Sequence, residues 1–338
     1  MKVGIVGGTG DLGMVLTREL VGRGDEVVWF TRDAAGNAES AVNAGVADVV
    51  AFDQDDPEGG WVEGLGRVDA VVLLAGSPIS DRWNPRTRAR IVASRVDLTR
   101  RVVDACEVVR GEAVSAHREP KPTTLVTISG VGVYGDRGDT LLDESEPPGQ
   151  DWLARVAALW ERQAMRAATL GMRVVVLRTG LVLDDRGLLP RMALPMRLFA
   201  GGPVGSGKQY VPWIHRDDVA RSFAHALDTE SMRGVYNNCA PEQVTMERFA
   251  AELGRELRRP SWMRVPESGL RIVLGPGAPT MVMSQRADAS RLLSTGFEFR
   301  YPELVPALDD LLHRNRRGGV DCGGPSGPAG RREPASGI

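Results

Sequence analysis

A glycine-rich stretch, GIVGGTGDLG at residues 4–13, restricts the fold more than any other feature of the sequence. It stands between a short apolar run, KVGIV, and a segment with helical periodicity, DLGMVLTRELVGRG. Glycines in this pattern permit a tight turn, close approach of the backbone to a pyrophosphate and close packing of helix on strand. The helix N-terminus adds free N–H groups that favour phosphates. The stretch predicts a dinucleotide site, with a purely structural turn as the alternative. Contacts are expected from Gly7, Thr9, Gly10, Asp11, Leu12 and Gly13.

Apolar runs and helical segments alternate over the first half of the chain. After the first unit come the runs EVVWFT, DVVAF, VDAVVLLAG, TTLVTIS and MRVVVLRTG. A long helix is expected from Asn84 to Val109 and another over 151–170. Such alternation is typical of parallel strands joined by right-handed crossovers. It predicts an α/β fold, a Rossmann-like doubly wound parallel sheet. The polar residues 110–122 show no periodicity and are expected to form a loop.

The organisation changes after residue 183, where the chain becomes rich in Gly, Pro and Arg and then mostly helical. Helices are expected at Thr245–Arg258, Glu267–Leu274, Gln285–Leu293 and Pro302–Arg314. We expect a cofactor-binding domain at 1–183, a smaller, mostly helical substrate lobe at 184–314 and a disordered tail at 315–338, because the tail is poor in large apolar residues.

The end of the second strand, WFTRD, bears on the choice of cofactor. An acid at this place holds the ribose 2′-hydroxyl of NAD, whereas an Arg suits a 2′-phosphate. Thr31 and Arg32 occupy these positions and favour NADP(H). A strand one residue longer would instead bring Asp33 to the ribose.

Charge and composition exclude several classes of partner. A formal net charge of −2 gives no field that attracts nucleic acid or anionic lipid. No apolar run approaches the roughly 20 residues that a bilayer requires, and the N-terminus is typical of a strand rather than a signal peptide. The three cysteines lack metal-like spacing and fit a reducing compartment. We expect a cytoplasmic protein with a small-molecule substrate, no metal, and a homodimer through the helices at 84–109 and 151–170.

An ordered set of motifs extends the interpretation from a fold to a family. The set is AGSPISDRW, SRVDLT, VYGDRGD, ARVAALWE, LRTGLVL, GGPVGSGKQYVPWIHRDDVA, RVPESGLRIVLG and QRADASRLLSTGFEFRYP. Over residues 1–314 the chain resembles the atypical extended short-chain dehydrogenase/reductases of the NAD-dependent epimerase/dehydratase family with a C-terminal DUF1731 domain. The resemblance implies a Rossmann-like domain that binds NADP(H), with substrate between it and the C-terminal lobe. The glycine loop also resembles that of deazaflavin-dependent NADP reductases, but only within about the first 35 residues.

One departure from ordinary short-chain reductases concerns their Tyr-x-x-x-Lys pair, in which the Lys lowers the pKa of a proton-transferring Tyr. None of the four tyrosines here is followed four residues later by Lys. Alignment on Trp160 and Glu161 puts Leu153 and Ala157 at the positions of the pair. The helix at 151–170 is therefore expected to be scaffold. The related family lacks the pair too.

Polar side chains at the carboxyl ends of strands are the candidates for chemistry, because open α/β sheets bind ligands there. Ser129 ends the fifth strand and Tyr134 follows in a Gly-rich turn; either could pass a proton to a substrate carbonyl or only pack. In GSGKQYVPWIHRDD, Lys208 could bind an anionic substrate, and His215 could act as an acid or base or link the lobes. The catalytic candidates are Ser129, Tyr134, Lys208 and His215.

Further contacts follow from the same reasoning about strand ends and the C-terminal lobe. The additional cofactor candidates are Thr31, Arg32, Asp53, Ala75, Gly76, Arg178, Thr179 and Gly180. The substrate candidates are Ser77, Arg82, Trp83, Arg95, Gln209 and Trp213. The sequence thus predicts an NADP(H)-dependent oxidoreductase acting on a small carbonyl, enone or imine. An epimerase or dehydratase with recycled cofactor and a non-catalytic NADP(H) sensor are the alternatives.

Overall fold

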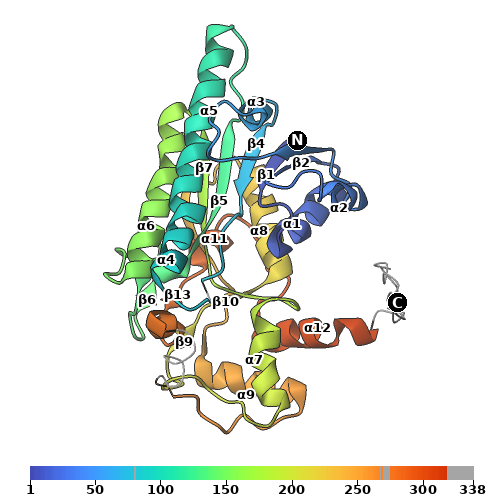
Figure 1. Cartoon of the computed structure of the whole chain (residues 1–338). Helices are drawn as coiled ribbons and strands as arrows, with labels where there is room; N and C mark the ends of the chain where they lie inside the picture. The colour runs from blue at the N-terminus through green and yellow to red at the C-terminus, as the bar shows by residue number, and fades with distance from the viewer. Residues whose placement is uncertain (80, 267, 269–274, 318–338) are drawn as a thin grey trace, which may run out of the picture.

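The computed structural model describes residues 1–79, 81–266, 268 and 275–317. Its centre is a seven-stranded sheet of order β11-β7-β5-β4-β1-β2-β3 in which all neighbours are parallel. The predicted α/β, Rossmann-like doubly wound sheet is therefore confirmed (Figure 1). The strands are β1 (Lys2–Val6), β2 (Glu26–Thr31), β3 (Asp48–Ala51), β4 (Ala70–Leu73), β5 (Thr124–Gly130), β7 (Arg173–Thr179) and β11 (Gly234–Asn238).

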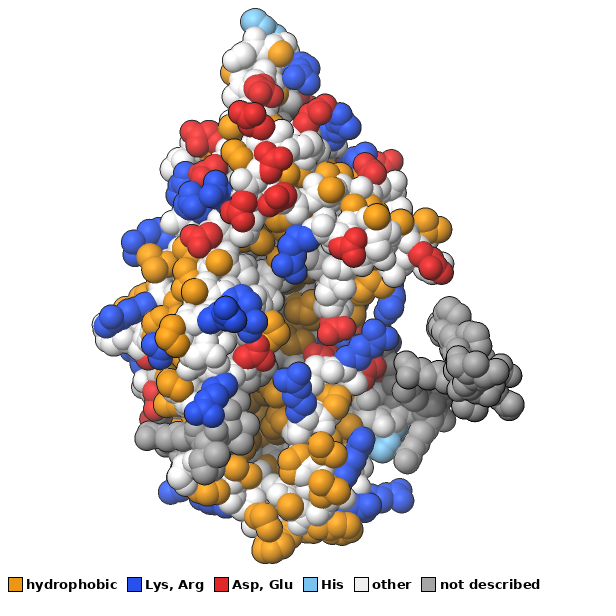
Figure 2. Space-filling model, viewed as in Figure 1, with side chains coloured by type: hydrophobic (Ala, Val, Ile, Leu, Met, Phe, Trp, Pro, Cys, Tyr) orange, Lys and Arg blue, Asp and Glu red, His pale blue; other side chains and the backbone are white. Residues whose placement is uncertain are grey.

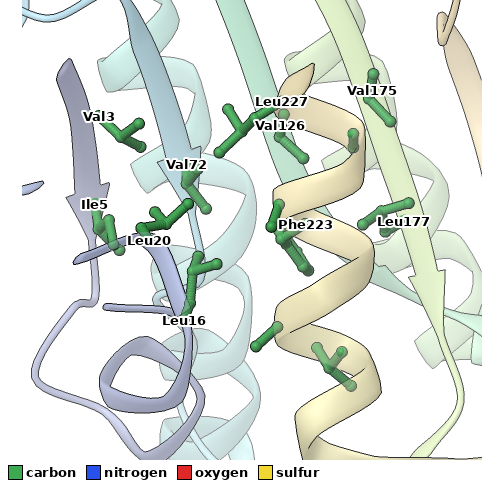
Figure 3. Packing of buried hydrophobic residues seen from close by; sticks show 14 of the residues in the cluster. Val3, Ile5, Leu16, Leu20, Val72, Val126, Val175, Leu177, Phe223 and Leu227 are labelled. Atoms are coloured by element: carbon green, nitrogen blue, oxygen red, sulfur yellow. The ribbon is translucent and has the colours of Figure 1, made fainter. Parts of the chain in front are cut away.

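Helices cover both faces of this sheet, which is why its central strands are apolar on both sides. On one face, α1 (Asp11–Gly22) and α8 (Arg216–Asp228) pack Leu16, Leu20 and Phe223 against the sheet (Figure 3). On the other face, α3 (Gly60–Leu65), α5 (Leu98–Ser115) and α6 (Trp152–Met165) form a second core. A short helix, α2 (Ala38–Asn43), joins β2 to β3.

The helix expected over 84–109 is present but has three parts. They are α4 (Pro85–Val92), a π-helical turn (Ala93–Asp97) and α5. The loop expected over 110–122 is wrong for its first six residues, which continue α5 to Ser115. Ala113 is buried there, and the Arg110 guanidinium donates to the carbonyls of Pro120 and Leu170, so tertiary contacts hold a polar segment in a helix.

The domain boundary expected at residue 183 also differs from the structure. Strand β11 and helix α8 follow that residue, yet both belong to the large sheet and its core. GVYNN contains two asparagines that are fully buried, which hid the strand from an apolar pattern.

The lower lobe in Figure 1 contains α7 (Leu188–Arg197), α9 (Met246–Leu257) and α12 (Leu304–Arg317) around its own apolar core. Helices α9 and α12 confirm the predictions at 245–258 and 302–314. The helix predicted at 285–293 is mostly wrong: β13 (Arg286–Ala287) pairs with β6 (Leu141–Leu142), and only α11 (Ser290–Leu293) is helical. The other strand pairs are β8 (Leu181–Leu183) with β10 (Trp213–His215) and β9 (Tyr210–Val211) with β12 (Val244–Thr245).

The helix predicted at 267–274 and most of the tail predicted at 315–338 lie outside the described residues, although α12 runs on to Arg317. Across the described part of the chain, no helix is both long and apolar enough to cross a bilayer. The homodimer through the helices at 84–109 and 151–170 stays a prediction.

Candidate functional site

The strand order reverses between β1 and β4, which are neighbours at the centre of the sheet. Ligands of open α/β sheets bind at the carboxyl ends of the strands at such a switch point. Figure 2 shows a hollow with apolar side chains inside it and Lys and Arg side chains around it, between the sheet-bearing part and the lower lobe. The candidate site is therefore the carboxyl edge of the sheet around the glycine loop.

The structural requirement for glycine differs between the positions of the loop. Gly7 has φ +96°, and a Cβ on it would lie 2.7 Å from the Ala75 nitrogen. A Cβ on Gly13 would lie 2.3 Å from the Gly7 oxygen, so both positions are set by the fold itself. Gly10 is different, because its Cβ would meet only the Gly7 oxygen, at 3.4 Å. The fold leaves room over Gly10 beside the first turn of α1.

That first turn of α1 presents backbone N–H groups without a side-chain cap. Gly10 is the N-cap residue, and the first hydrogen bond of the helix runs from the Met14 N–H to the Gly10 carbonyl. The N–H groups ahead of Met14 are the ones that a helix leaves for an anion. Thr9 and Asp11 are exposed beside them, and Leu12 helps to line a pocket of about 60 Å³ that reaches Arg216.

The end of β2 supports the role predicted for Arg32. The strand ends at the buried Thr31, so it is not extended toward Asp33. The Asp33 carboxylate accepts a hydrogen bond of 2.8 Å from the Gly36 N–H and is held in its own turn. Arg32 is exposed directly after the strand, where its charged side chain is available to a ligand. Asp53, after β3, is exposed and accepts from the Asp55 N–H.

Ser129 and Tyr134 lie next to the site, but both belong to a buried polar network. The Ser129 hydroxyl donates to Glu161 on α6 at 2.7 Å, and Arg178 on β7 pairs with both oxygens of Glu161 at 2.8 and 2.9 Å. Arg178 also donates to the Tyr134 hydroxyl at 2.9 Å, and that hydroxyl donates to Asn237 on β11 at 2.7 Å. All five side chains are less than a tenth exposed.

The network corrects the roles expected for Tyr134 and Arg178. The proton of each hydroxyl is already donated within the protein, and burial raises the pKa of Tyr134 to about 12. Tyr134 is therefore placed as a structural side chain rather than a proton donor near neutral pH. Arg178 is engaged with Glu161 rather than turned toward a nicotinamide. Ser129 keeps only its acceptor lone pairs for a ligand.

We expect Tyr134→Phe to lower the free energy of unfolding by about 1–3 kcal/mol, because it strands the Asn237 oxygen and an Arg178 N–H in the core. Urea denaturation measures the change. Tyr210→Phe is the matched control, since no hydrogen bond of the Tyr210 hydroxyl is found among the described residues, and it should change stability by less than about 0.5 kcal/mol. A Tyr134→Phe protein of unchanged stability that loses turnover would instead make this hydroxyl catalytic.

The two positions of α6 that align with the missing Tyr-x-x-x-Lys pair carry apolar side chains that pack against neighbouring elements. Leu153 packs near Gly132 and with the cluster around Trp83. Ala157 is buried with Val131 and Val133. At these two positions helix α6 thus carries packed apolar side chains.

Most candidates between 208 and 218 hold the lower lobe together. The Gln209 amide donates to the Val204 carbonyl at 2.8 Å, and the fully buried Trp213 donates to the Glu242 carbonyl at 3.1 Å. His215 Nδ1 accepts from the Asp217 N–H as the N-cap of α8, and its Nε2 lies 3.3 Å from an Asp310 oxygen on α12. These groups are buried and engaged, which favours structural roles, and the catalytic role for His215 and the substrate roles for Gln209 and Trp213 stay predictions.

Lys208, by contrast, is exposed, and its charge is available to an anionic substrate.

The sequence shows no spacing typical of metal ligands, but the fold brings together two groups of three potential ligands. These are His215, Asp217 and Asp310, and Glu256, Asp309 and His313. In each trio the ligand atoms lie within 4.8 Å of one another. Spacing along the chain could not reveal groups that meet from separate helices.

The remaining candidates divide between packing and the site. Trp83 is buried against Gly277 and donates to the Ile79 carbonyl, while Arg82 lies against Gly275. Thr179 is buried, and a Cβ on Gly180 would lie 2.6 Å from the Pro212 oxygen, so both pack against neighbouring strands.

By contrast, the segment after β4 is assembled at the site. Ala75 lies against Gly7, and Gly76 lies against the Arg95 guanidinium. Arg95 donates to the Ser77 carbonyl at 2.9 Å, and the Ser77 N–H donates to Ser94. Ala75 thus contacts the glycine loop directly, and Arg95 contacts the two residues that follow it, Gly76 and Ser77.

Comparisons with known proteins agree with this geometry. The NAD dependent epimerase/dehydratase family matches residues 3–239, and the domain of unknown function DUF1731 matches residues 265–311. The chain is 35% identical over 313 residues, 92% of its length, to the Arabidopsis thaliana epimerase family protein SDR39U1 homolog, chloroplastic, covering 87% of that protein. It is 32% identical over 315 residues to the Bacillus subtilis (strain 168) epimerase family protein YfhF, with 92% and 98% of the two chains covered.

A solved structure shares the whole arrangement. The crystal structure of human epimerase family protein SDR39U1 (isoform2) with NADPH superposes with a TM-score of 0.76 at 30% identity, over 92% of this chain and 99% of that one. The similarity includes both the sheet and the lower lobe.

Proposed function

The chain belongs to the NAD dependent epimerase/dehydratase family, and from that premise we propose that it is an NADP(H)-dependent oxidoreductase of the atypical short-chain type. Its substrate is a small molecule with a carbonyl, enone or imine. The observation that carries the proposal is the free space over Gly10 at the uncapped N-terminus of α1, at the switch point of the sheet. A pyrophosphate fits that place chemically, because free N–H groups and the helix dipole both favour an anion.

The residues present also fit the 2′-phosphate that distinguishes NADP(H). Arg32 follows β2 directly, while the carboxylate of Asp33 is bound within its own turn. The human relative, 30% identical, was crystallised with NADPH, which supports the same cofactor here.

Arg32→Ala should weaken NADPH binding about tenfold or more and leave NADH binding unchanged, because a charge-assisted hydrogen bond to the 2′-phosphate is lost. Fluorescence titration of both nucleotides measures the two affinities. The control is Arg67→Ala, which removes an exposed arginine that pairs with Glu63 of α3. Equal losses for NADPH and NADH would contradict a 2′-phosphate contact.

When bound, NADPH supplies a hydride from C4 of its nicotinamide. The protein's part is to orient the substrate carbonyl and to exclude bulk water from the carboxyl edge of the sheet. We assign the accompanying proton to a single ordered water molecule, since Ser129 and Tyr134 already donate theirs to Glu161 and Asn237. The absence of a Tyr-x-x-x-Lys pair supports the same assignment.

The test is incubation with 4-deuterated NADPH and a metabolite extract from the source organism, followed by mass spectrometry. Deuterium in a product supports the oxidoreductase and identifies its substrate. Tight NADPH binding without label contradicts it.

The buried network favours a second candidate of another class, a non-catalytic NADP(H)-binding sensor. The hydroxyls of Ser129 and Tyr134, at and just after the end of β5, both donate to other side chains of the protein. A sensor binds NADPH without turnover and changes its affinity for a partner protein when NADPH is present. An epimerase or dehydratase that recycles its cofactor would use the same pocket and retain the label within the enzyme.

A further inference from the structure

Arg95 stands out because of where the backbone puts it. It lies in the π-helical turn Ala93–Asp97 between α4 and α5. Such turns occur mostly as single interruptions of α-helices and frequently at functional sites. Its guanidinium reaches the segment after β4, where it donates through Nη1 to the Ser77 carbonyl at 2.9 Å and to Ser94 at 3.3 Å. The turn therefore delivers a cation to the carboxyl edge of the sheet.

This cation is desolvated without an acid to balance it. Burial lowers the pKa of Arg95 to about 10, and no ion pair of Arg95 occurs within the described ranges. Its guanidinium carbon lies 5.4 Å from the centre of the Trp160 ring, and that ring is fixed by a hydrogen bond to Thr99. A partly buried charge without a counter-charge carries a cost that an anionic ligand would relieve.

One edge of the guanidinium is open. Nη1 is used, whereas no hydrogen bond from Nε or Nη2 is present in the part of the chain that the structure describes. Gly76 lies alongside, and a Cβ there would come within 3.3 Å of the guanidinium carbon and Nη2. Glycine thus keeps a side chain off this group. The Nε and Nη2 edge carries two parallel N–H donors, the arrangement that binds the two oxygens of a carboxylate.

We propose that Arg95 anchors a carboxylate of the substrate, so that the substrate is a small carbonyl or imine compound that also bears a carboxylic acid. The single positive charge of Arg95 matches the single charge of a carboxylate. The Ala75–Ser77 segment places this anchor beside the glycine loop, because Ala75 contacts Gly7 and Gly76 contacts Arg95. The inference rests on the proposed function, which supplies the reacting carbonyl or imine.

Isothermal titration of the full chain, free and loaded with NADPH, tests the anchor at constant ionic strength. The probes are pyruvate and benzoate, their uncharged counterparts pyruvamide and benzamide, and inorganic phosphate. We expect a carboxylate to bind at least about tenfold more tightly than its amide. Arg95→Met should remove that preference, and Arg95→Lys should restore part of it, since Lys offers charge but no planar fork. NADPH affinity should be the same in all variants.

Arg88→Met is the matched control. Arg88 lies on the adjoining α4 and also stacks on tryptophans, at 5.1 Å from the Trp152 ring, but no hydrogen bond joins it to Ala75–Ser77 among the described residues. Its variant should keep the carboxylate preference. The proposal is overturned by equal binding of acids and amides, by no binding of either acid, by tighter binding of phosphate, or by an Arg95→Met protein that loses only NADPH affinity. Failure of NADPH itself to bind would refute the proposed function, while the titration of the free protein still tests the anchor.

Discussion

Gly10→Asp should leave the protein folded and reduce NADPH affinity about a hundredfold or more. A Cβ at residue 10 meets only one atom, the Gly7 oxygen at 3.4 Å, and the backbone there has φ −77°, which any residue adopts. Asp is also a better N-cap than Gly by a few tenths of a kcal/mol. The new carboxylate would occupy the place of the pyrophosphate and repel it, and like charges in close contact cost several kcal/mol.

Fluorescence titration gives the NADPH affinity of this variant, and thermal unfolding gives its stability. Gly111→Asp is the control, because a Cβ on Gly111 in α5 would have no atom within 4 Å. It adds the same charge at a distance and should leave NADPH binding unchanged. A folded Gly10→Asp protein with normal affinity would refute the glycine loop as the phosphate site.

Arg178→Met should lower the free energy of unfolding by about 3–5 kcal/mol, the largest effect on stability that we expect from one substitution. The change leaves the buried Glu161 without its bidentate partner and takes a donor from Tyr134. The Ser129 hydroxyl alone then solvates a buried negative charge.

Urea denaturation measures this loss, and two further variants make the result specific. Arg178→Met combined with Glu161→Leu should recover most of it, since an apolar pair replaces a buried ion pair at little cost. Arg67→Met, which breaks an exposed pair with Glu63, should cost less than about 1 kcal/mol. If Arg178→Met costs no more than Arg67→Met, the network does not stabilise the fold.

Local signals explain what the sequence predicted well. The runs that form β1 to β5 and β7 are apolar enough to indicate buried strands, and the glycine loop marks the strand-to-helix turn at the switch point. Strand β11 is not predicted by an apolar pattern, because Asn237 and Asn238 are polar. Burial of Asn237 is possible because partners from distant segments, Tyr134 and the Leu142 carbonyl, satisfy its amide, while the Asn238 amide donates to the Thr179 hydroxyl.

The same reason limits prediction of the site. Tyr134 was placed correctly near the end of β5, but the partner of its hydroxyl is 103 residues away. Glu161 stands in the helix that the sequence predicts to be scaffold, and its sequence neighbours give no sign that Ser129 and Arg178 converge on it. A hydrogen-bond network is decided by contacts between elements, which short-range periodicity does not describe.

The course of the chain between the sheet and the lower lobe bears on how this protein changes over evolution. From β7 the chain enters the lobe at α7, returns to the sheet with α8 and β11, leaves again at α9, returns with Leu292 and Phe297, and re-enters the lobe at α12. The lobe is thus no continuous segment, and recombination at one point cannot replace it by another lobe. A change of the lobe therefore requires substitutions in several separate segments of the chain, with the sheet segments between them retained.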